Sequence, residues 1–362
     1  MVLPSNRQKN SYLETAPSLK PLKSNNLNRR DGTKLVAWFQ KNKVPHPWRC
    51  YWQESHDPYF VWISEIMLQQ TSIATVIPRY IEFIEKFKNI TLLSRASETS
   101  IRKYTAGMGY YRRFRFMQQM AIEVGKRENF PQTYQELLKM PGIGPYTAAA
   151  ISSICFNEPQ AVVDGNVERV LCRLYDIREA PNSPLLKKEY PRLLESFFNK
   201  NYPGDFNEGI MELGQKICTP NKPNCPECVF NKKCLSFKES SQHLAPAKKI
   251  KKNKKEVYCE ITVKINGNRI ALEDRREESK FLRNTTGFRH KICSPVKEFD
   301  FQHTITNHKI KAIVKISSSN STKFKWLPIS LASSQLETSF DKKAFKIVRD
   351  KIAIMSGFSQ KD

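Results

Sequence analysis

Residues 134–154 read YQELLKMPGIGPYTAAAISSI, a pattern that predicts two helices joined by a tight hairpin turn. A short helix is expected to end before Pro141, and Pro145 is typical of the first position of the next helix. Between them, Gly142 and Gly144 predict a tight turn without side-chain bulk, so backbone N–H groups at the start of the second helix can approach an anion. The alternative interpretation is an ordinary helical corner.

The chain has 362 residues, and its 60 Lys plus Arg against 35 Asp plus Glu give a net charge of +25. This length favours two domains over one. A basic chain of this size most often binds a polyanion, with nucleic acid the first candidate; a merely solvated basic surface is the alternative. Phosphate is therefore the anion expected at the glycine turn.

Neither a membrane segment nor a secretory signal is predicted. No stretch approaches ~18–20 uninterrupted apolar residues, and the N-terminal sequence MVLPSNRQKNSYLET has no apolar run after its basic residues. We therefore expect no membrane partner and a cytoplasmic location.

Composition and periodicity divide the chain into four segments. Residues 1–30 are basic with little apolar periodicity, which predicts a flexible tail. Residues 31–238 show apolar spacings of three and four, as helices do. Residues 239–256 contain the run KKIKKNKK and are interpreted as a basic linker. Residues 257–362 alternate between apolar and polar positions, which predicts a smaller α+β domain.

The alternation in the last segment is specific enough to assign strand faces. One face of a first strand comprises Val257, Cys259, Ile261, Val263 and Ile265. A turn is expected at Asn266-Gly267. The second alternating run comprises Ile310, Ala312, Val314 and Ile316, and a helix is expected around residues 342–355. The predicted fold is thus mainly α, followed by a small α+β domain.

Four of the nine cysteines crowd into one segment with the spacing C-x6-C-x2-C-x5-C: Cys218, Cys225, Cys228 and Cys234. An unsecreted chain favours thiols or metal ligation over disulfides. Zinc sites usually show two close cysteine pairs, and only one is present here. Four thiolates can also hold a [4Fe–4S] cluster. Spacing alone leaves zinc and iron–sulfur comparable.

Glu65 lies in the stretch 59–77, YFVWISEIMLQQTSIATVI, which predicts one largely apolar helix with Glu65, Gln69 and Ser72 on one face. Apolar neighbours would desolvate the carboxylate and raise its pKa, as a general acid near neutral pH requires. The alternative is a helix carboxylate hydrogen-bonded to its neighbours.

Asp164 lies in AVVDGNVERVLCRLY, after an apolar run and directly before a predicted helix. An N-cap role is the simplest interpretation. A carboxylate at a helix N-terminus also stays ionised, which suits stabilisation of a cationic transition state.

The ordered motifs WISEIMLQQT (62–71), GMGYYRR (107–113), MPGIGPYTAAA (140–150), VVDGNVERV (162–170) and the four-cysteine loop are similar to those of a known family. Together they resemble the helix–hairpin–helix DNA glycosylase superfamily, and most closely adenine glycosylases of the MutY type. The resemblance is strong over about residues 34–238. It implies a two-part helical glycosylase domain with a [4Fe–4S] loop at 218–234, followed by a Nudix-like domain.

The resemblance also implies roles for individual residues. Glu65 would protonate the adenine ring and Asp164 would stabilise the oxocarbenium-like sugar. Tyr146 occupies the position of the nucleophilic lysine in bifunctional relatives, and Asn166 would support the sugar end of the site.

The residues expected to line the pocket for the flipped adenine are Trp48, Arg49 and Glu208. Those expected to wedge into the duplex are Gln69, Gln70, Thr71 and Tyr110. Gly142 and Gly144 would hold the DNA backbone, and Cys218, Cys225, Cys228 and Cys234 would bind the cluster.

Several positions depart from the family pattern. His46 stands where the family has Leu, and the loop 50–57 is expected to be longer than in the family. Glu168 is expected to weaken DNA attraction slightly. In the C-terminal domain, the stretch 272–288 lacks an acidic Nudix box, so pyrophosphate hydrolysis is not expected. The family's oxoguanine-reading loop aligns with residues 303–307, where Thr306 keeps the hydroxyl.

The function predicted from these observations is a monofunctional glycosylase that excises adenine mispaired with 8-oxoguanine or guanine in base excision repair. A thymine or uracil mismatch glycosylase is the alternative enzyme, and a non-catalytic DNA-binding iron–sulfur protein is the alternative outside enzymes. The expected partner is double-stranded DNA containing A:8-oxoguanine or A:G mispairs. We expect a monomer that is associated with the nucleoid if the source is a bacterium.

Overall fold

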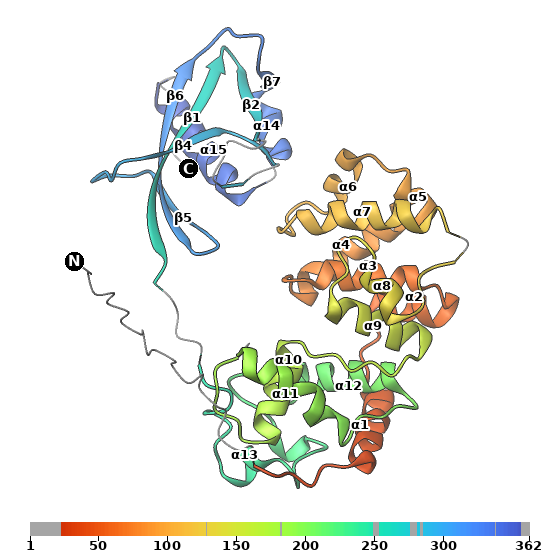
Figure 1. Cartoon of the computed structure of the whole chain (residues 1–362). Coiled ribbons are helices and arrows are strands. Elements are labelled where there is room, and N and C mark those ends of the chain that lie inside the picture. The colour runs from red at the N-terminus through yellow and green to blue at the C-terminus, as the bar shows by residue number, and fades with distance from the viewer. Residues whose placement is uncertain are drawn as a thin grey trace, which may run out of the picture. The chain divides into compact units, whose positions relative to one another are not determined.

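The structure, a computed structural model, describes residues 23–127, 129–181, 183–248, 253–275, 281–282, 285–336 and 338–355. The chain divides into two units, the first made of Met1–Ile66 with Met120–Lys249 and the second of Met67–Gln119 with Ile250–Asp362 (Figure 1). Most of the expected tail, part of the linker and part of the stretch 272–288 lie outside the described residues. Within the described part, no helix is long and apolar enough to cross a membrane.

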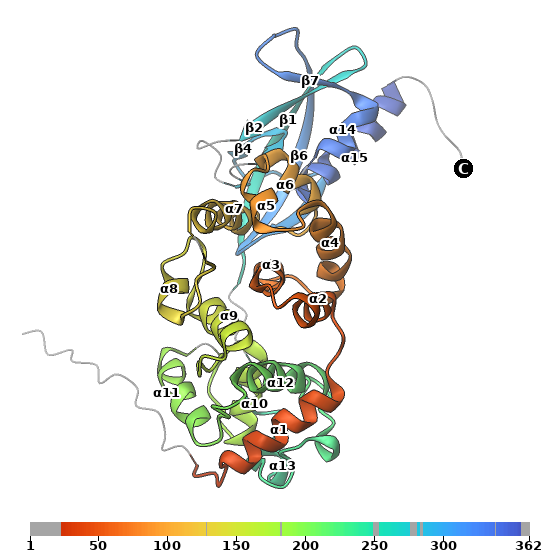
Figure 2. The same cartoon turned by 90° about the vertical axis from the view of Figure 1, so that its right-hand side faces the viewer.

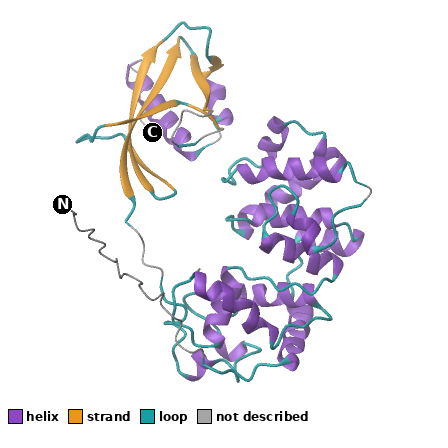
Figure 3. Cartoon of the chain, viewed as in Figure 1, coloured by secondary structure: helices purple, strands orange, loops and turns teal. Residues whose placement is uncertain are grey.

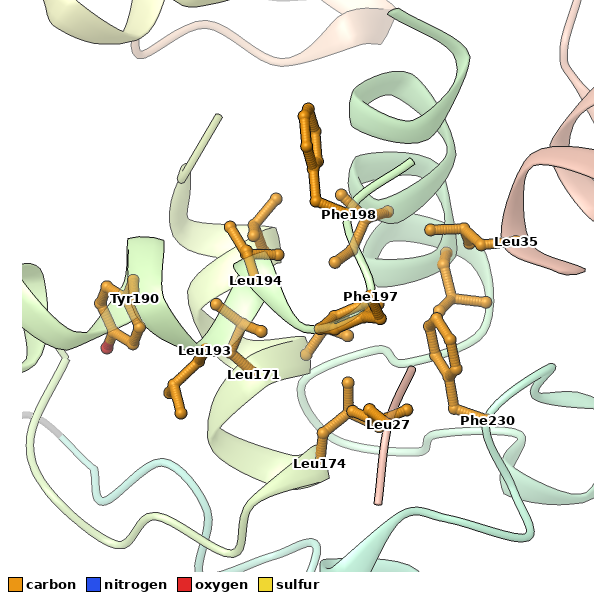
Figure 4. Close-up of a cluster of buried hydrophobic side chains, with 14 of the residues drawn as sticks. Leu27, Leu35, Leu171, Leu174, Tyr190, Leu193, Leu194, Phe197, Phe198 and Phe230 are labelled. Carbon is orange, nitrogen blue, oxygen red and sulfur yellow. The ribbon is translucent and has the colours of Figure 1, made fainter. Parts of the chain in front are cut away.

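The first unit is helical. Its complete helices are α1 (Arg29–Asn42), α2 (Pro47–Ser55), α8 (Tyr134–Leu138), α9 (Pro145–Phe156), α10 (Gly165–Leu174), α11 (Pro184–Glu195), α12 (Pro203–Lys216) and α13 (Leu235–Lys238). Helices α3 (Pro58–Leu68) and α7 (Arg112–Val124) each pass from one unit to the other. Helix α12 packs against α1, α9 and α10 (Figure 2). Their shared core is filled by leucine and phenylalanine side chains such as Leu35, Leu171 and Phe197 (Figure 4).

The predicted flexible tail is too long at its C-terminal end. Leu27 is buried in the core of the first unit. Asn28 caps α1 through a capping box with Asp31, and Asn25 Nδ2 donates to the carbonyl of Leu174 at 2.7 Å. Residues 23–30 are therefore part of the folded unit, because they satisfy backbone groups and fill apolar space.

The helix predicted over residues 59–77 is in fact two helices. Helix α3 ends at Leu68, Gln70 has a φ of 57°, and the Ser72 side chain caps α4 (Ile73–Lys86) by accepting from Thr75 N at 3.4 Å. Gln69 and Ser72 thus do not continue the helical face of Glu65. Helices α5 (Ile90–Ser94) and α6 (Glu98–Tyr104) complete this helical segment of the second unit.

The C-terminal region is a mixed sheet with two helices (Figure 3). Its strands are β1 (Lys255–Asn266), β2 (Arg269–Arg275), β3 (Thr285–Gly287), β4 (Arg289–Cys293), β5 (Phe301–Ile305), β6 (His308–Ser318) and β7 (Lys325–Pro328). The order is β3-β2-β1-β6-β5, with β4 paired to β1 and β7 to β2. Strands β1 and β6 are parallel, and the other pairs are antiparallel. Helices α14 (Ile329–Gln335) and α15 (Ser339–Met355) follow the sheet.

The strand faces predicted from alternation are confirmed. Cys259, Ile261 and Val263 of β1 are buried in one core with Ile310, Ala312 and Val314 of β6. The turn after β1 lies one residue later than expected, because Asn266 pairs with Arg269 and leaves Gly267 and Asn268 at the turn. Gly267 has a φ of 53°, which favours glycine. The helix expected around residues 342–355 is confirmed as the larger part of α15.

The basic linker is shorter than predicted. Ala245 is buried, and the amide of Ala247 donates to the carbonyl of Glu179 at 3.1 Å. Strand β1 already begins at Lys255. Residues up to 247 therefore pack on the first unit.

Candidate active site

Glu65 lies on α3 in a small pocket of the first unit. The pocket is lined by Trp48, Arg49, Trp52, Val61, Ser64, Glu65, Ile154 and Glu208. The structure thus brings together four residues predicted from the sequence, namely Glu65, Trp48, Arg49 and Glu208. Trp52, Val61, Ser64 and Ile154 were missed, although Trp52 and Val61 lie one helical turn from Trp48 and Glu65 and were within reach of helical periodicity.

The Glu65 carboxyl is poised to hold a proton near neutral pH. Burial raises its pKa to about 7, and repulsion from Glu208 and Asp164 adds to the rise, while a hydrogen bond from the Tyr146 hydroxyl opposes it. Only 8% of Glu65 is exposed. A carboxylic acid that keeps its proton at this pH can donate it to a basic leaving group.

Tyr146 lies in the first turn of α9, directly after the glycine turn. Its hydroxyl lies 3.2 Å from Sδ of Met211. Burial raises the pKa of Tyr146 well above its ordinary value, and the negative charges of Glu65 and Asp164 add to this effect. The phenol therefore stays protonated and serves as a hydrogen-bond donor. Lys139, the nearest lysine before the turn, is exposed, as expected.

Asp164 is the N-cap of α10, as its simplest interpretation predicted. Its Oδ1 accepts from the amides of Asn166 at 2.9 Å and Val167 at 2.8 Å, and its Oδ2 accepts from Asn166 Nδ2 at 2.7 Å. Three N–H groups therefore hold this carboxylate in one orientation at the start of α10. Its charge also acts on Glu65, so the two predicted carboxylates belong to one electrostatic site.

Arg49 is held between two carboxylates. Its Nε donates to Glu208 at 2.6 Å and its Nη1 to Glu212 at 2.6 Å. Glu212 also pairs with Lys216 at 2.8 Å, and these hydrogen bonds outweigh its burial and hold its pKa below the ordinary value. Burial raises the pKa of Glu208, although Arg49 opposes the rise. The prediction missed Glu212, since its link to Arg49 spans more than 160 residues.

Trp48 is buried at the start of α2, and its ring stacks on His46 with the centroids 4.7 Å apart. His46, which departs from the family pattern, thus packs against Trp48, one of the residues that line the pocket. Burial lowers the pKa of His46, as does the nearby charge of Arg49. Residues 50–55, expected to form part of a long loop, are instead helical.

The glycine turn has the predicted geometry. Gly142 has a φ of 76°, a conformation that L side chains rarely adopt, and Gly144 is the N-cap of α9. The amide of Ile143 donates to Met140 at 3.2 Å. Within the described part of the chain, the amides of Gly142 and Gly144 have no acceptor, so both can serve an anion.

The residues predicted to enter the duplex lie in the second unit, on two loops that Arg113 joins. Its Nη2 donates to Thr71 Oγ1 at 2.7 Å and to the carbonyl of Met108 at 3.3 Å. Its Nη1 donates to the carbonyls of Met67 and Gln69. Gln70 is exposed, and Tyr110 is 60% exposed with a φ of 49°. The role of Arg113 was missed, although the residue belongs to the motif GMGYYRR.

Thr306 occupies the turn between β5 and β6. It is exposed and has a φ of 49°, which is an outlier for a β-branched residue. Strained backbone residues cluster at binding sites, so this turn is a candidate contact site.

The four clustered cysteines line one apolar cavity of the first unit. Arg173 Nη1 donates to Cys218 Sγ at 3.3 Å, and Gln242 Nε2 lies 3.7 Å from Cys225 Sγ. Among the described residues, no three His, Cys, Asp or Glu side chains converge closely enough to hold a single metal ion. Four thiols that line one apolar cavity are a donor set that a [4Fe–4S] cluster can use, with one thiolate on each iron.

Glu168 does not lie at the surface, where it was expected to weaken DNA attraction. It is 5% exposed and accepts a hydrogen bond from the Tyr190 hydroxyl at 2.7 Å. Its charge is thus directed into the core beside α11 rather than toward a ligand.

Residues 63–196, which contain Glu65, Tyr146 and Asp164, match the sequence model of the HhH-GPD superfamily of base excision DNA repair proteins. The matched range contains three of the residues predicted to form the active site. The chain is also 38% identical over 258 residues to the adenine DNA glycosylase of Arabidopsis thaliana, covering 63% of this chain and 41% of that protein. It is 40% identical over 217 residues to that of Homo sapiens, covering 58% and 39%. The resemblance seen in the sequence is thereby confirmed.

A bacterial relative gives a similar result. The adenine DNA glycosylase of Buchnera aphidicola subsp. Baizongia pistaciae is 39% identical over 204 residues, covering 56% of this chain and 58% of that protein. The chain thus spans less than two thirds of the length of these curated relatives. Among solved structures, a thermostable thymine-DNA glycosylase has a TM-score of 0.49 and 26% identity, covering 57% of this chain and 95% of that chain.

Proposed function

We propose that this protein is a monofunctional DNA glycosylase that excises adenine mispaired with 8-oxoguanine or guanine. One observation carries the proposal: Glu65 shares a pocket with Trp48, Arg49 and Glu208. Burial raises the pKa of Glu65 to about 7, and the charge of Asp164 adds to this rise. The similarity to adenine DNA glycosylases supports the choice of base.

The two carboxyl groups suit hydrolysis of an N-glycosidic bond. Glu65 can give its proton to the departing base, while the Asp164 carboxylate, held by three N–H donors, would stabilise the developing cationic sugar. The base must first leave the helical stack, and the pocket lined by Trp48 and Arg49 is the place for it. The glycine turn can hold the DNA backbone during this step.

The alternatives make different demands on the site. A binding protein needs neither a protonated Glu65 nor a second carboxyl group at Asp164, and a thymine glycosylase would act on a different mispair. The deciding experiment is a base-release assay on an A:8-oxoguanine duplex, with T:G and A:T duplexes as controls. Release from T:G but not from A:8-oxoguanine would establish the thymine enzyme, and binding without any release would establish the non-catalytic protein.

The product is expected to be an intact abasic strand that breaks only after alkali or heat. Lyase chemistry needs a lysine amine that forms an imine with the sugar, and the corresponding position holds Tyr146, whose phenol stays protonated and cannot form an imine. Borohydride added during the reaction should trap little covalent complex. Stoichiometric trapping, or strand cleavage that keeps pace with base release, would show that another lysine performs the chemistry.

We propose that the four thiols of Cys218, Cys225, Cys228 and Cys234 hold a [4Fe–4S] cluster and that this cluster orders the loop 218–234. Purified protein should contain about four irons per chain and absorb in the visible range. Cys225→Ser should lower the iron content, whereas Cys293→Ser, on β4, should not. Stoichiometric zinc without iron after anaerobic purification would contradict the proposal.

We propose that the C-terminal region is Nudix-like and reads 8-oxoguanine through Thr306. Thr306→Val keeps the shape and removes the hydroxyl, so the preference for A:8-oxoguanine over A:G should fall by about tenfold, as the loss of one hydrogen bond implies. Excision from A:G should be unchanged. Thr304→Val, two residues earlier on β5, is the matched control. Equal preference in the Thr306 variant and the wild type would show that the hydroxyl has no such role.

A further inference from the structure

The C-terminal sheet has one face that carries basic side chains in a regular array. Alternation places one set of β1 and β6 residues in the core with α14 and α15. The strand register places the opposite set on the other face. Five basic residues of β4 and β6 lie there and are called the lysine face below: Arg289, Lys291, Lys309, Lys311 and Lys315.

Two glutamates of β1, Glu256 and Glu260, organise the lysine face. Glu256 pairs with Lys309 at 3.4 Å and with Lys311 at 3.0 Å. Glu260 pairs with Lys291 at 3.2 Å and with Lys315 at 2.7 Å. Each carboxylate therefore contacts two ammonium groups, and the face keeps a net positive charge.

Aromatic rings hold part of the array in place. The Lys311 ammonium lies 5.2 Å from the ring centroid of Tyr258 and 5.5 Å from that of Phe299. Such contacts orient a long side chain along the sheet. The side chains of Lys291 and Lys315 remain 70% and 61% exposed despite their ion pairs, so both can reach a ligand.

We propose that the lysine face binds the phosphate backbone of duplex DNA, as a contact surface separate from the active site. The inference rests on the proposed function in taking DNA as the partner. Charge complementarity selects the occupant, because a face with five cations and two anions attracts a polyanion. Lys315 lies six positions after Lys309 on β6, about 20 Å along a strand, which matches the axial rise of about six phosphates of one DNA strand.

The test is the salt dependence of binding to an undamaged duplex. The triple variant Lys291→Gln/Lys309→Gln/Lys315→Gln removes three cations. It should reduce the slope of log K against log salt by about two to three and weaken binding roughly 10- to 100-fold at 0.1 M salt. The matched control is Lys342→Gln/Lys346→Gln/Arg349→Gln, which removes three exposed cations from α15. The control should lose much less affinity.

A second variant changes the net charge of the lysine face in the opposite direction. Glu260→Gln removes a carboxylate and frees Lys291 and Lys315, so it should tighten DNA binding and steepen the salt slope. If the ion pairs served stability alone, both variants would lower the melting temperature and neither would change the slope. An unchanged slope in the triple variant, or a loss no larger than in the α15 control, overturns the proposal. Because binding to undamaged DNA requires no excision, failure of the proposed glycosylase activity would be seen separately, in the base-release assay.

Discussion

Glu65→Gln is expected to slow adenine release by about 10²- to 10⁴-fold, the usual contribution of a general acid, while leaving affinity for the mismatched duplex nearly unchanged. The amide has the shape of the carboxyl group but carries no dissociable proton. Single-turnover excision and equilibrium binding should be measured with the same duplex. Glu54→Gln, an exposed position on α2, is the matched control and should behave as the wild type.

The pH dependence gives a second readout of the same residue. Burial raises the pKa of Glu65 to about 7, so the protonated, active form predominates below that pH and is lost above it. The single-turnover rate of the wild type should therefore fall about tenfold per pH unit on the alkaline side. The residual rate of Glu65→Gln should lack this fall. Excision by the variant near the wild-type rate would show that Glu65 is not the acid.

Asp341→Ala is expected to destabilise the C-terminal region by about 3–5 kcal/mol, because it leaves the buried guanidinium of Arg275 without a counter-charge. Arg275 Nη1 and Nη2 donate to the two carboxylate oxygens of Asp341 at 3.0 and 2.6 Å. The amide of Phe288 donates to the same carboxylate at 3.1 Å. Asp341 is fully buried and Arg275 is 6% exposed. The pair thus joins β2 to α15 inside the core.

Hydrogen exchange of the β1 and β6 amides would measure this loss within the full chain. Asp350→Ala removes an exposed carboxylate from the same helix and should change stability by less than about 0.5 kcal/mol. The double variant Arg275→Met/Asp341→Leu removes both charges and should recover most of the loss. Protection in Asp341→Ala equal to that of the wild type would mean that water reaches Arg275 and that the pair contributes little.

Local features of the fold were accessible from the sequence. The glycine turn, the cap at Asp164 and the strand faces of β1 and β6 each depend on residues within a few positions of one another, and all were predicted correctly. The single helix predicted over 59–77 was wrong, because its break depends on a residue that is distant in the sequence. Apolar periodicity continues through the sequence there, while the chain turns at Gln70 and restarts at Ser72, in a loop that Arg113 holds from more than 40 residues away.

In the candidate site, too, some features follow from the local sequence and others depend on residues that are distant in the chain. The motifs in the sequence named Glu65, Trp48 and Glu208 as site residues, and the structure places these three in one pocket. The protonation and orientation of these side chains depend on contacts that folding creates. The proton on Glu65 depends on burial by α2 and α9 and on the charge of Glu208, and the orientation of Arg49 depends on Glu212. Hydrogen-bonding patterns along a chain are local, whereas desolvation and charge coupling sum over every group that folding brings near, so they exist only in the folded protein.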